Sequence, residues 1–581
     1  MPDSRSVPTP QSPDLATFTL QVGGQAVSPQ THLLAATVTF AANRVPWARF
    51  SFRDGDVGDE TFALSESSTF VPGAEVELRL GYHGDEQTVF KGHLTRHGIV
   101  AEGRRPSQLT VECRHPACRM TLAARNREYA DQTDADIANT LLSEHGLAGD
   151  IASTAVTHAQ MVQFGATDWD FLILRARANG QLVLPRLEAL DIQPPKFDGS
   201  PVLALGYGGA LERFEGELEA RLQAASFKAL GWDPSSLEAV EGTAENAPEP
   251  AAGDPDAAAL ADSVGAPEAA DWHAGSVAAD ELQAWAGARL QRQRAAKLRG
   301  RARCRGFAGI WPGDCIELAG LGGRFDGVAW VSAVRHELRN GVWRTDLQLG
   351  LDPAWANWEE PGIPTARGLL PAPRGLQIGV VAGLEGDPAG NERILVRLPV
   401  THADGQGLWA RLATLEAGNK RGHVFRPEIG DEVVVGFLDD DPRHPVVLGA
   451  FHSGAHPSPI PADDDNHEKG YLSRAELTLH FHDDDKVITL ATKQGNQLVL
   501  SEKDKSVTLS DQNQNKVVLS QDGIVVESAK AITLKAATDI TLEGVNISIK
   551  ASAQLKAEGS AQAELSSGGS TAVKGSLVQI N

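Results

Sequence analysis

The chain has few cysteines, no long apolar run and a shortage of positive charge. Its four cysteines form no CxxC pair in 581 residues, which favours buried reduced thiols over a disulfide framework or a zinc site. No apolar stretch approaches the ~20 residues that a membrane-spanning helix needs. Residues 1–14 are polar and rich in Pro and Ser, without the apolar core of a signal peptide. We therefore expect a protein that is made in the cytoplasm and stays soluble.

The charge balance excludes partners that need a positive field. Lys and Arg number 53 against 76 Asp and Glu, and the formal net charge is −23. Nucleic acid and anionic membrane surfaces both attract basic proteins. A basic run does occur at 289–305, but its alternation places Arg299, Arg301, Arg303 and Arg305 on one strand face. On so acidic a chain, a solvated or internally paired face explains this run, and we expect no nucleic-acid partner.

The N-terminal half predicts strands with two helices. Residues 17–110 show alternating apolar patterns, including a hairpin over EVELRLGYHGDEQTVFKGHLTRHGIV. Helical spacing appears over 134–145, with Gly146 as a stop signal, and again over 167–180, where Thr167 or Asp168 can cap the helix. Strands resume through Tyr207.

Three stretches of the chain have the composition of linkers. Residues 241–270 are Ala, Pro, Gly and acids with almost no large apolar groups, which is typical of a linker. A Pro-rich connector covers 353–375, and a second polar linker begins near residue 456. Between the last two, five short β patterns over 376–451 predict a small closed barrel.

A repeat of paired apolar residues fills the C-terminal part. From Leu477 the pairs recur about every ten residues, and from Ile532 the beat shortens to seven or eight, as in Ile532 with Leu534 and Ile540 with Leu542. Side chains alternate along a strand, so each pair lies on one face and mainly Thr, Lys, Glu and Ser lie on the other. Each strand therefore has a narrow apolar strip of about two residues.

Such a strand cannot offset the entropy of ordering it alone, and its open edges invite aggregation. A one-chain β-solenoid usually needs about twenty residues per turn with several inward positions, which an eight-residue beat does not supply. Three chains that each contribute one short strand per layer can close a thin core around a common axis. We therefore predict a needle built from three chains.

The segment KRGHVFRPEIGDEVVVGFLDDDPRHPVVLGAFHSG (420–454), followed by this repeat, closely resembles the barrel and spike of VgrG proteins. The segments at 70–100 and 166–176 resemble hub proteins at the tip of phage-tail-like contractile injection systems. The nearest resemblance is to the short VgrG-type spikes of extracellular particles such as the antifeeding prophage and the Photorhabdus virulence cassettes. It covers nearly the whole chain except residues 1–14 and the acidic linker.

The resemblance implies a mainly β fold with a few helices: two tube-like β-barrel hub domains, an OB-fold barrel, and a C-terminal triple-stranded intertwined β-helix needle formed by a homotrimer. The implied domains are an N-terminal arm at 1–14; a hub domain at 15–240 with the first tube-like barrel, helices and start of the second; an acidic Ala/Pro-rich linker or insertion at 241–276; the rest of the second barrel at 277–352; a connector at 353–375; the OB-fold barrel at 376–455; a linker at 456–475; and the spike at 476–581.

The family's function and partners follow from the same resemblance. It implies a trimeric spike and hub that adapts a hexameric inner tube to threefold symmetry and pierces a target envelope on sheath contraction. The implied partners are the inner tube protein, baseplate hub and wedge proteins, a PAAR-like tip protein, effector cargo and, transiently, the target membrane. The particle would be released from the cell or delivered into the target envelope.

No catalytic constellation appears, and we expect no enzyme activity and no cofactor. HExxH, GxxxxGK[ST] and GxSxG are absent, and the roughly twenty residues between barrel and needle are too few for an inserted domain. The chain ends in strand pattern, so no effector domain is expected. His480 and His482 are the best metal candidates, but they alternate with Leu479 and Phe481 and are expected on the solvated face. DDDP at 439–442 predicts a hairpin tip.

Two alternatives remain open, a trimeric tail fibre that binds a receptor and a spike with a cryptic cell-wall hydrolase. A fibre normally ends in an aromatic-rich head, whereas only one Phe and no Trp or Tyr follows Leu477. For the preferred interpretation, the predicted tip-protein interface is Leu577, Val578, Gln579, Ile580 and Asn581. The predicted trimer core of the needle is Leu498, Leu500, Leu509, Leu519, Ile532, Leu534, Ile540, Leu542, Ile547, Ile549 and Leu555.

Overall fold

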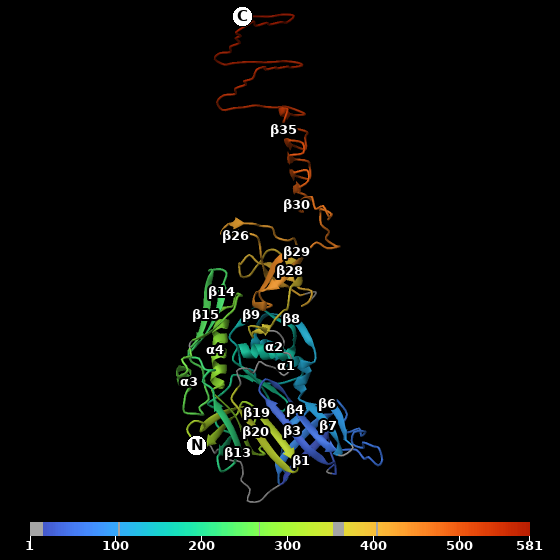
Figure 1. Ribbon diagram of the computed structural model, residues 1–581, viewed down its shortest axis with the longest axis vertical. Helices are drawn as coiled ribbons and strands as arrows, with labels where there is room; N and C mark the ends of the chain where they lie inside the picture. The colour runs from blue at the N-terminus through green and yellow to red at the C-terminus, as the bar shows by residue number, and fades with distance from the viewer. Residues whose placement is uncertain are drawn as a thin grey trace. The chain divides into compact units, whose positions relative to one another are not determined.

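The computed structural model describes residues 15–28, 30–102, 105–266, 268–351, 365–401 and 405–580. They divide into two compact units, Met1–His456 and Pro457–Asn581, which are described separately (Figure 1). The predicted N-terminal arm, most of the predicted connector and Asn581 lie outside the described residues. No described helix has the length and apolar character needed to cross a membrane.

One sheet of 13 strands forms the base of the first unit. Its two halves, one from each half of the hub sequence, join where β19 (Gly327–Arg339) pairs antiparallel with β3 (Leu33–Ala41). The sheet order is β13-β17-β20-β19-β3-β4-β7-β6-β5-β1-β2, with β12 and β18 on a branch. The other strands of this sheet are β1 (Ala16–Val22), β2 (Gln25–Ala26), β4 (Arg44–Arg53), β5 (Glu75–Tyr82), β6 (Asp85–Glu102), β7 (Arg105–Arg114), β12 (Leu203–Gly206), β13 (Leu211–Leu218), β17 (Leu298–Arg305), β18 (Cys315–Ala319) and β20 (Val342–Leu349).

Each half of this sheet has its own apolar core. Alternating residues of the N-terminal strands bury a cluster rich in phenylalanine, including Phe50, Phe52 and Phe90. The C-terminal strands bury a second cluster of mostly aliphatic residues, such as Ile316 and Leu347. The shared sheet joins these two cores, and the division of the hub into two tube-like domains stays a prediction.

Two helices follow the first half of the sheet, as predicted. The hydroxyl of Thr133 accepts the N–H of Asp136 at the start of α1 (Asp134–Glu144), and Thr167 caps α2 (Asp168–Ala178) in the same way. Almost every side of α2 is buried, so it is an enclosed helix. Neighbouring elements are η1 (Pro116–Thr121), β8 (Ala124–Thr133), β9 (Thr157–Thr167), β10 (Leu182–Pro185) and β11 (Leu190–Gln193).

The prediction of a linker at 241–276 is wrong, because this range is folded. The end of β15 (Glu238–Ala244) and β16 (Ala269–Trp272) flank the central strand β14 (Phe227–Asp233), and α3 (Ala257–Ser263) lies between them in sequence. Small residues in β15 allow this strand to pack closely against the backbone of α4. A Cβ on Gly242 would lie 2.3 Å from the backbone nitrogen of Gln283, in the helix α4 (Ala279–Ala295) that packs on β15.

Deleting residues 241–270 should therefore unfold this part of the hub. The deletion removes most of β15, all of α3 and half of β16, and it exposes the buried face of α4. We expect insoluble protein, or a soluble protein with protease cleavage in α4, measured by limited proteolysis. Intact, protease-resistant protein would restore the linker interpretation.

The basic run at 289–305 is internally paired, as expected from the sequence. Along β17, Arg299 lies 2.8 Å from Glu217 on β13, and Arg303 lies 2.7 Å from Asp346 on β20. The guanidinium of Arg305 stacks over the ring of Tyr82. The four cysteines are unpaired thiols, also as expected.

The barrel expected at 376–455 is present. Five strands close it in the order β23-β24-β25-β29-β28, and each coincides with one of the five predicted β patterns. The barrel strands are β23 (Gln377–Gly383), β24 (Ile394–Arg397), β25 (Leu408–Leu412), β28 (Glu432–Phe437) and β29 (Pro445–Ala450); beside them lie the short pairs β21 (Thr365–Ala366) with β22 (Leu370–Pro371) and β26 (Ala417–Gly418) with β27 (Arg421–Gly422), and η2 (Leu438–Asp440).

The second unit begins with an antiparallel sheet of seven strands made by one chain. Its first strand lies inside the predicted linker at 456–475. The ten-residue beat thus produces a meander within the chain, because each strand of five residues is followed by a tight turn back. The strands are β30 (Glu468–Leu472), β31 (Thr478–His482), β32 (Val487–Ala491), β33 (Gln497–Ser501), β34 (Ser506–Ser510), β35 (Lys516–Ser520) and β36 (Gly523–Glu527).

The segment with the seven- to eight-residue repeat, residues 528–580, has a different structure. Among the described residues 528–580 no strand pairs with another, and the chain runs back and forth as extended arms (Figure 1). The arms therefore leave their backbone groups available to other strands.

Candidate functional site

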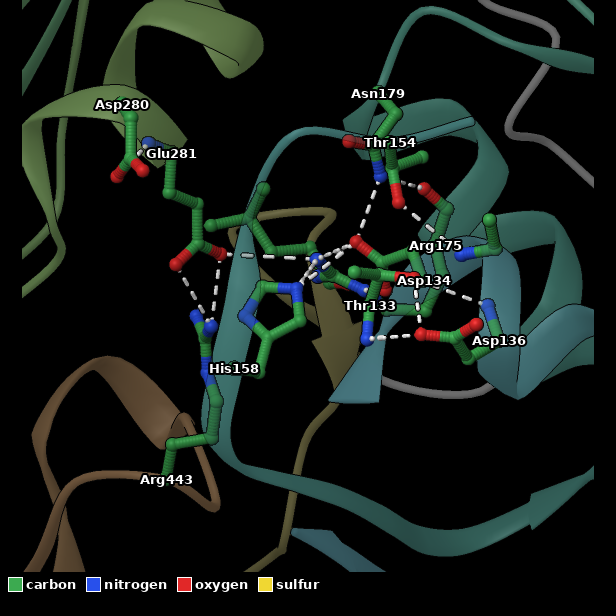
Figure 2. Close-up of polar contacts among 12 residues, drawn as sticks. Thr133, Asp134, Asp136, Thr154, His158, Arg175, Asn179, Asp280, Glu281 and Arg443 are labelled. Carbon is green, nitrogen blue, oxygen red and sulfur yellow. Dashed lines mark hydrogen bonds and ion pairs between the residues drawn. The ribbon is translucent and has the colours of Figure 1, made fainter. Parts of the chain in front are cut away.

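A chain of buried charges joins the helices of the hub to the barrel (Figure 2). It starts at Asp134, the first residue of α1, whose carboxylate accepts hydrogen bonds from Arg175 Nε at 2.7 Å and Nη2 at 2.9 Å. His158 Nε2 lies 3.0 Å from the same carboxylate, and Asn179 Nδ2 donates to it at 2.8 Å. Arg175 also donates to the carbonyl of Leu369 at 3.0 Å. The capping box that starts α1 fixes where Asp134 points.

The chain of charges continues into the barrel through Glu281 on α4. Arg175 Nη2 lies 3.7 Å from Glu281, and Arg443 Nη1 donates to both Glu281 oxygens at 2.8 and 3.0 Å. Arg443 belongs to the turn between β28 and β29, where its Nη2 also donates to Asp441 at 2.8 Å. Arg443 therefore bridges a carboxylate of the barrel and a carboxylate of the hub.

Electrostatics hold these groups in their charged forms despite burial. Burial alone raises the pKa of a carboxyl, but the guanidinium of Arg175 keeps the pKa of Asp134 well below its usual range. Arg443 does the same for Glu281 and Asp441 against the same cost of burial. Burial lowers the pKa of Arg443, but Asp441 and Glu281 outweigh it and raise that pKa. The network is thus charged and paired at neutral pH.

The barrel also meets the hub through apolar and backbone contacts. Val162 on β9 belongs to the apolar core of the barrel, and the rings of Phe164 and Phe437 lie 6.4 Å apart. Gln160 donates to the carbonyl of Gly407 at 2.7 Å. Charged and apolar contacts together fix the barrel on the hub within the first unit.

Three residues of this region have the spacing of a metal site but not its chemistry. One ligand atom each of His273, Asp441 and His444 lie within 4.8 Å of one another. However, His273 Nδ1 accepts the N–H of Gly275 at 2.9 Å, and its Nε2 lies 3.2 Å from Asp441. Arg443 donates to the same carboxylate at 2.8 Å, so a dication bound there would lie beside a guanidinium. The described contacts are those of an Arg443–Asp441 ion pair with two histidines beside it.

The ring of His444 packs directly against Gly275, at a position where any larger residue would clash with it. A Cβ on Gly275 would lie 2.3 Å from the His444 ring, which also meets the His273 ring edge to face at 5.4 Å. Burial lowers the pKa of His444 to about 4. Burial likewise lowers the pKa of His115 and of His336 to about 4 in the hub.

These neutral histidines predict a loss of stability in acid. Unfolded imidazoles take up protons below a pKa of about 6.5, whereas His115 and His336 stay neutral in the fold until about pH 4. Between these values the unfolded chain binds more protons, so the free energy of unfolding decreases as pH falls, by roughly 3 kcal/mol per residue. We expect the urea midpoint to drop between pH 7 and pH 4.5. His336→Gln should flatten this slope, and a midpoint independent of pH would contradict the prediction.

On the spike, the predicted apolar pairs fall into two continuous rows. Leu498 lies opposite Leu490 and Leu509, and Leu500 lies opposite Ile488 and Val507. Residues directly opposite in an antiparallel pair point to the same face, so both rows lie on one face of the sheet. Leu500, Leu509 and Leu519 remain 40–54% exposed in the single chain, and a groove of about 490 Å³ lies along Leu479, Leu490 and Leu498.

The other face differs from the sequence prediction. Val499, Val518 and Val525 stand in its central row with Thr489 and Thr508, so it is not wholly polar. His480 is on this face, as expected, opposite Thr489. The neighbouring His482 accepts the N–H of Asp485 on Nδ1 at 3.2 Å.

The remaining predicted residues of the needle core lie in the extended arms. All of them are more than half exposed in the single chain, which is an unusual density of uncovered aliphatic side chains. Their role as a core stays a prediction, as does that of the tip residues, of which Leu577 and Ile580 are 77% and 93% exposed. The residues concerned are Ile532, Leu534, Ile540, Leu542, Ile547, Ile549 and Leu555.

Comparison with known proteins identifies the fold and the family. The family model described as the Alg8 N-terminal domain matches residues 12–340, more than half of the chain. The chain belongs to this family. The model of the type VI secretion system and phage-baseplate injector OB domain matches residues 377–452, which are the five-stranded barrel.

Individual relatives are VgrG spike proteins. The chain is 40% identical over 105 residues to the type VI secretion system spike protein VgrG4b of Pseudomonas aeruginosa, covering 16% of this chain and 13% of that protein. It is 28% identical over 139 residues to VgrG3 of Vibrio cholerae, covering 23% and 13%. These matches span about an eighth of either relative. Over these segments the chain is similar to spike proteins of the VgrG type.

Solved structures support the fold. A chain of the lidded Francisella PdpA–VgrG complex superposes with a TM-score of 0.51 at 9% identity, covering 89% of this chain and 80% of that one. At this identity the similarity concerns the fold alone. The mainly β architecture with a closed barrel agrees with the sequence-based expectation.

Proposed function

We propose that three copies of this chain form the central spike and hub of the baseplate of a phage-tail-like contractile injection system. The observation that carries the proposal is the pair of apolar rows on the proximal sheet, together with aliphatic residues in the arms that no described residue of the chain covers. Three copies around one axis would bury these rows and pair the open arms. The relatives that the chain resembles are themselves structural spikes.

In this proposal the chain works mechanically and not as an enzyme. The hub would match a hexameric inner tube to threefold symmetry and contact baseplate hub and wedge proteins. The spike would be driven into a target envelope on sheath contraction, touching the target membrane transiently, with effector cargo carried by the assembly. The exposed last residues, Leu577 to Ile580, would bind a PAAR-like tip protein.

The mass of the purified protein tests the assembly. Light scattering should give about 185 kDa, three times the 61.7 kDa chain. Removing residues 573–581 should keep this mass while abolishing co-purification of the tip protein. A monomeric wild type would overturn the trimer, whereas a trimer that keeps its tip protein after truncation would place the tip contact elsewhere.

A further inference from the structure

In the distal spike, residues 528–580, the first three layers of the repeat carry charges whose sign changes from one layer to the next. Lys530 and Lys535 flank the first apolar pair, Asp539 and Glu543 flank the second, and Lys550 follows the third. Farther on, Lys556 and Glu558 of one layer pair with each other. The next two layers carry a single charge of opposite sign each, Glu564 and then Lys574.

The two parts of the spike satisfy their charges differently. In the proximal sheet, lysines pair with carboxylates of the same chain on neighbouring strands or turns. In the distal arms the five charges of the first three layers have no ion-pair partner within the described residues of the chain. The proximal pairs are Lys469–Asp483, Lys486–Glu502, Lys493–Glu476, Lys503–Asp485 and Lys516–Glu527.

The apolar rows cannot align three copies by themselves. Each distal layer presents nearly the same pair of aliphatic residues, so a copy that slips by one layer would place Ile532 and Leu534 where Ile540 and Leu542 belong. The buried face would be almost unchanged. A repeat of this kind leaves its register weakly specified unless another feature penalises the slip.

The alternating charges supply that penalty. Lys535, Glu543 and Lys550 each follow directly after the second apolar residue of their layer, so they occupy the same position in successive strands. Adjacent strands lie about 4.8 Å apart. If a chain passes to the next face after each layer, neighbouring layers on one face belong to different copies. In the correct register, Lys535 of one copy lies next to Glu543 of a second copy, which lies next to Lys550 of the third. If one copy slips by one layer, residues of like charge become neighbours instead.

We propose that the alternating charges of residues 530–550 set the register of the three copies in the distal spike. The inference rests on the proposed trimer and names the residues that make its assembly specific. The partner groups of these side chains are carboxylates and ammonium groups of a second copy of this chain. Each contact is repeated three times around the axis, which adds together interactions that are weak singly.

Charge reversal with compensation tests the proposal on the full chain. K535E/K550E places a carboxylate directly after the second apolar residue in three successive layers, whereas K535E/E543K/K550E restores alternation at this position with the signs inverted. We expect amide exchange over residues 528–580 to be about tenfold faster in the double variant and within twofold of wild type in the triple variant. Raising the salt to about 1 M should shrink the difference, because these charges are exposed.

The outcomes separate the two proposals. A wild type that is not trimeric by light scattering overturns the proposed function, and the register proposal with it. A trimeric wild type with equal exchange in all three proteins overturns the register proposal alone. Amide exchange in the triple variant as fast as in the double variant would also overturn the register proposal. It would show that lysine at positions 535 and 550 is required and that alternation of charge is not.

Discussion

Replacing Arg443 by methionine should destabilise the contact between barrel and hub by about 3–5 kcal/mol. Arg443 is buried and donates to Glu281 on α4 and to Asp441 in its own turn. Methionine fills similar volume but leaves buried Asp441 without its guanidinium and Glu281 with only the more distant Arg175, at 3.7 Å. Removing one partner of a buried ion pair costs more than removing both, because the remaining charge stays desolvated.

Amide exchange in β28, β29 and α4 measures this effect. A destabilisation of this size should make exchange there at least 100-fold faster in R443M than in the wild type. The triple variant E281Q/D441N/R443M should recover much of the loss, since it removes the uncompensated charges together. Arg421→Met, in the β26–β27 pair beside the barrel, is the matched control. Its ion pair with Glu416 is exposed on both sides and should contribute less than about 1 kcal/mol. Equal effects of R443M and R421M would contradict the role of burial.

Ile549→Asp should open the distal spike, whereas Ser548→Asp should leave it intact. If three copies close one core, Ile549 faces two copies of itself, and burying Ile contributes roughly 1.5–3 kcal/mol per side chain. The substitution removes three such side chains at once. It also brings three carboxylates together without water, so some must be protonated or the layer must open.

Ser548 is the control because it is the neighbouring residue on the opposite face of the same arm. Ser548→Asp adds the same three charges where solvent screens them. Limited proteolysis should cut Ile549→Asp within residues 540–560 while the proximal sheet stays protected. Cleavage at the same rate in both variants would argue against a three-chain core.

The candidate network could not be predicted from the sequence, although its parts were visible. The helical spacing over 134–145 predicted α1 correctly, and DDDP at 439–442 does form the turn between β28 and β29. Nothing local indicates that Asp441 of this turn is buried against His273. The only signal was the density of charged residues in DDDPRH, which is equally common in solvated hairpin tips.

Features that depend on neighbours along the chain could be predicted from the residues alone. Strand alternation, the spacing of α1 and α2 and the five barrel strands were predicted because a side chain's face follows from the period of its own element. The spacing of the spike repeat likewise determined that its apolar residues form rows on one face. The resemblance of residues 420–454 to VgrG proteins indicated the barrel type.

Features that depend on contacts distant in sequence became visible only in the folded chain. Residues 241–276 looked like a linker because alanine and glycine bury little surface, yet they fold since their small size lets β15 approach the backbone of α4. The pairing of β19 with β3 merges the two hub cores into one sheet. The Asp134–Arg175–Glu281–Arg443 chain joins residues up to 309 positions apart. Buried charges are stabilised only by the partner that folding brings to them, and no local pattern specifies that partner.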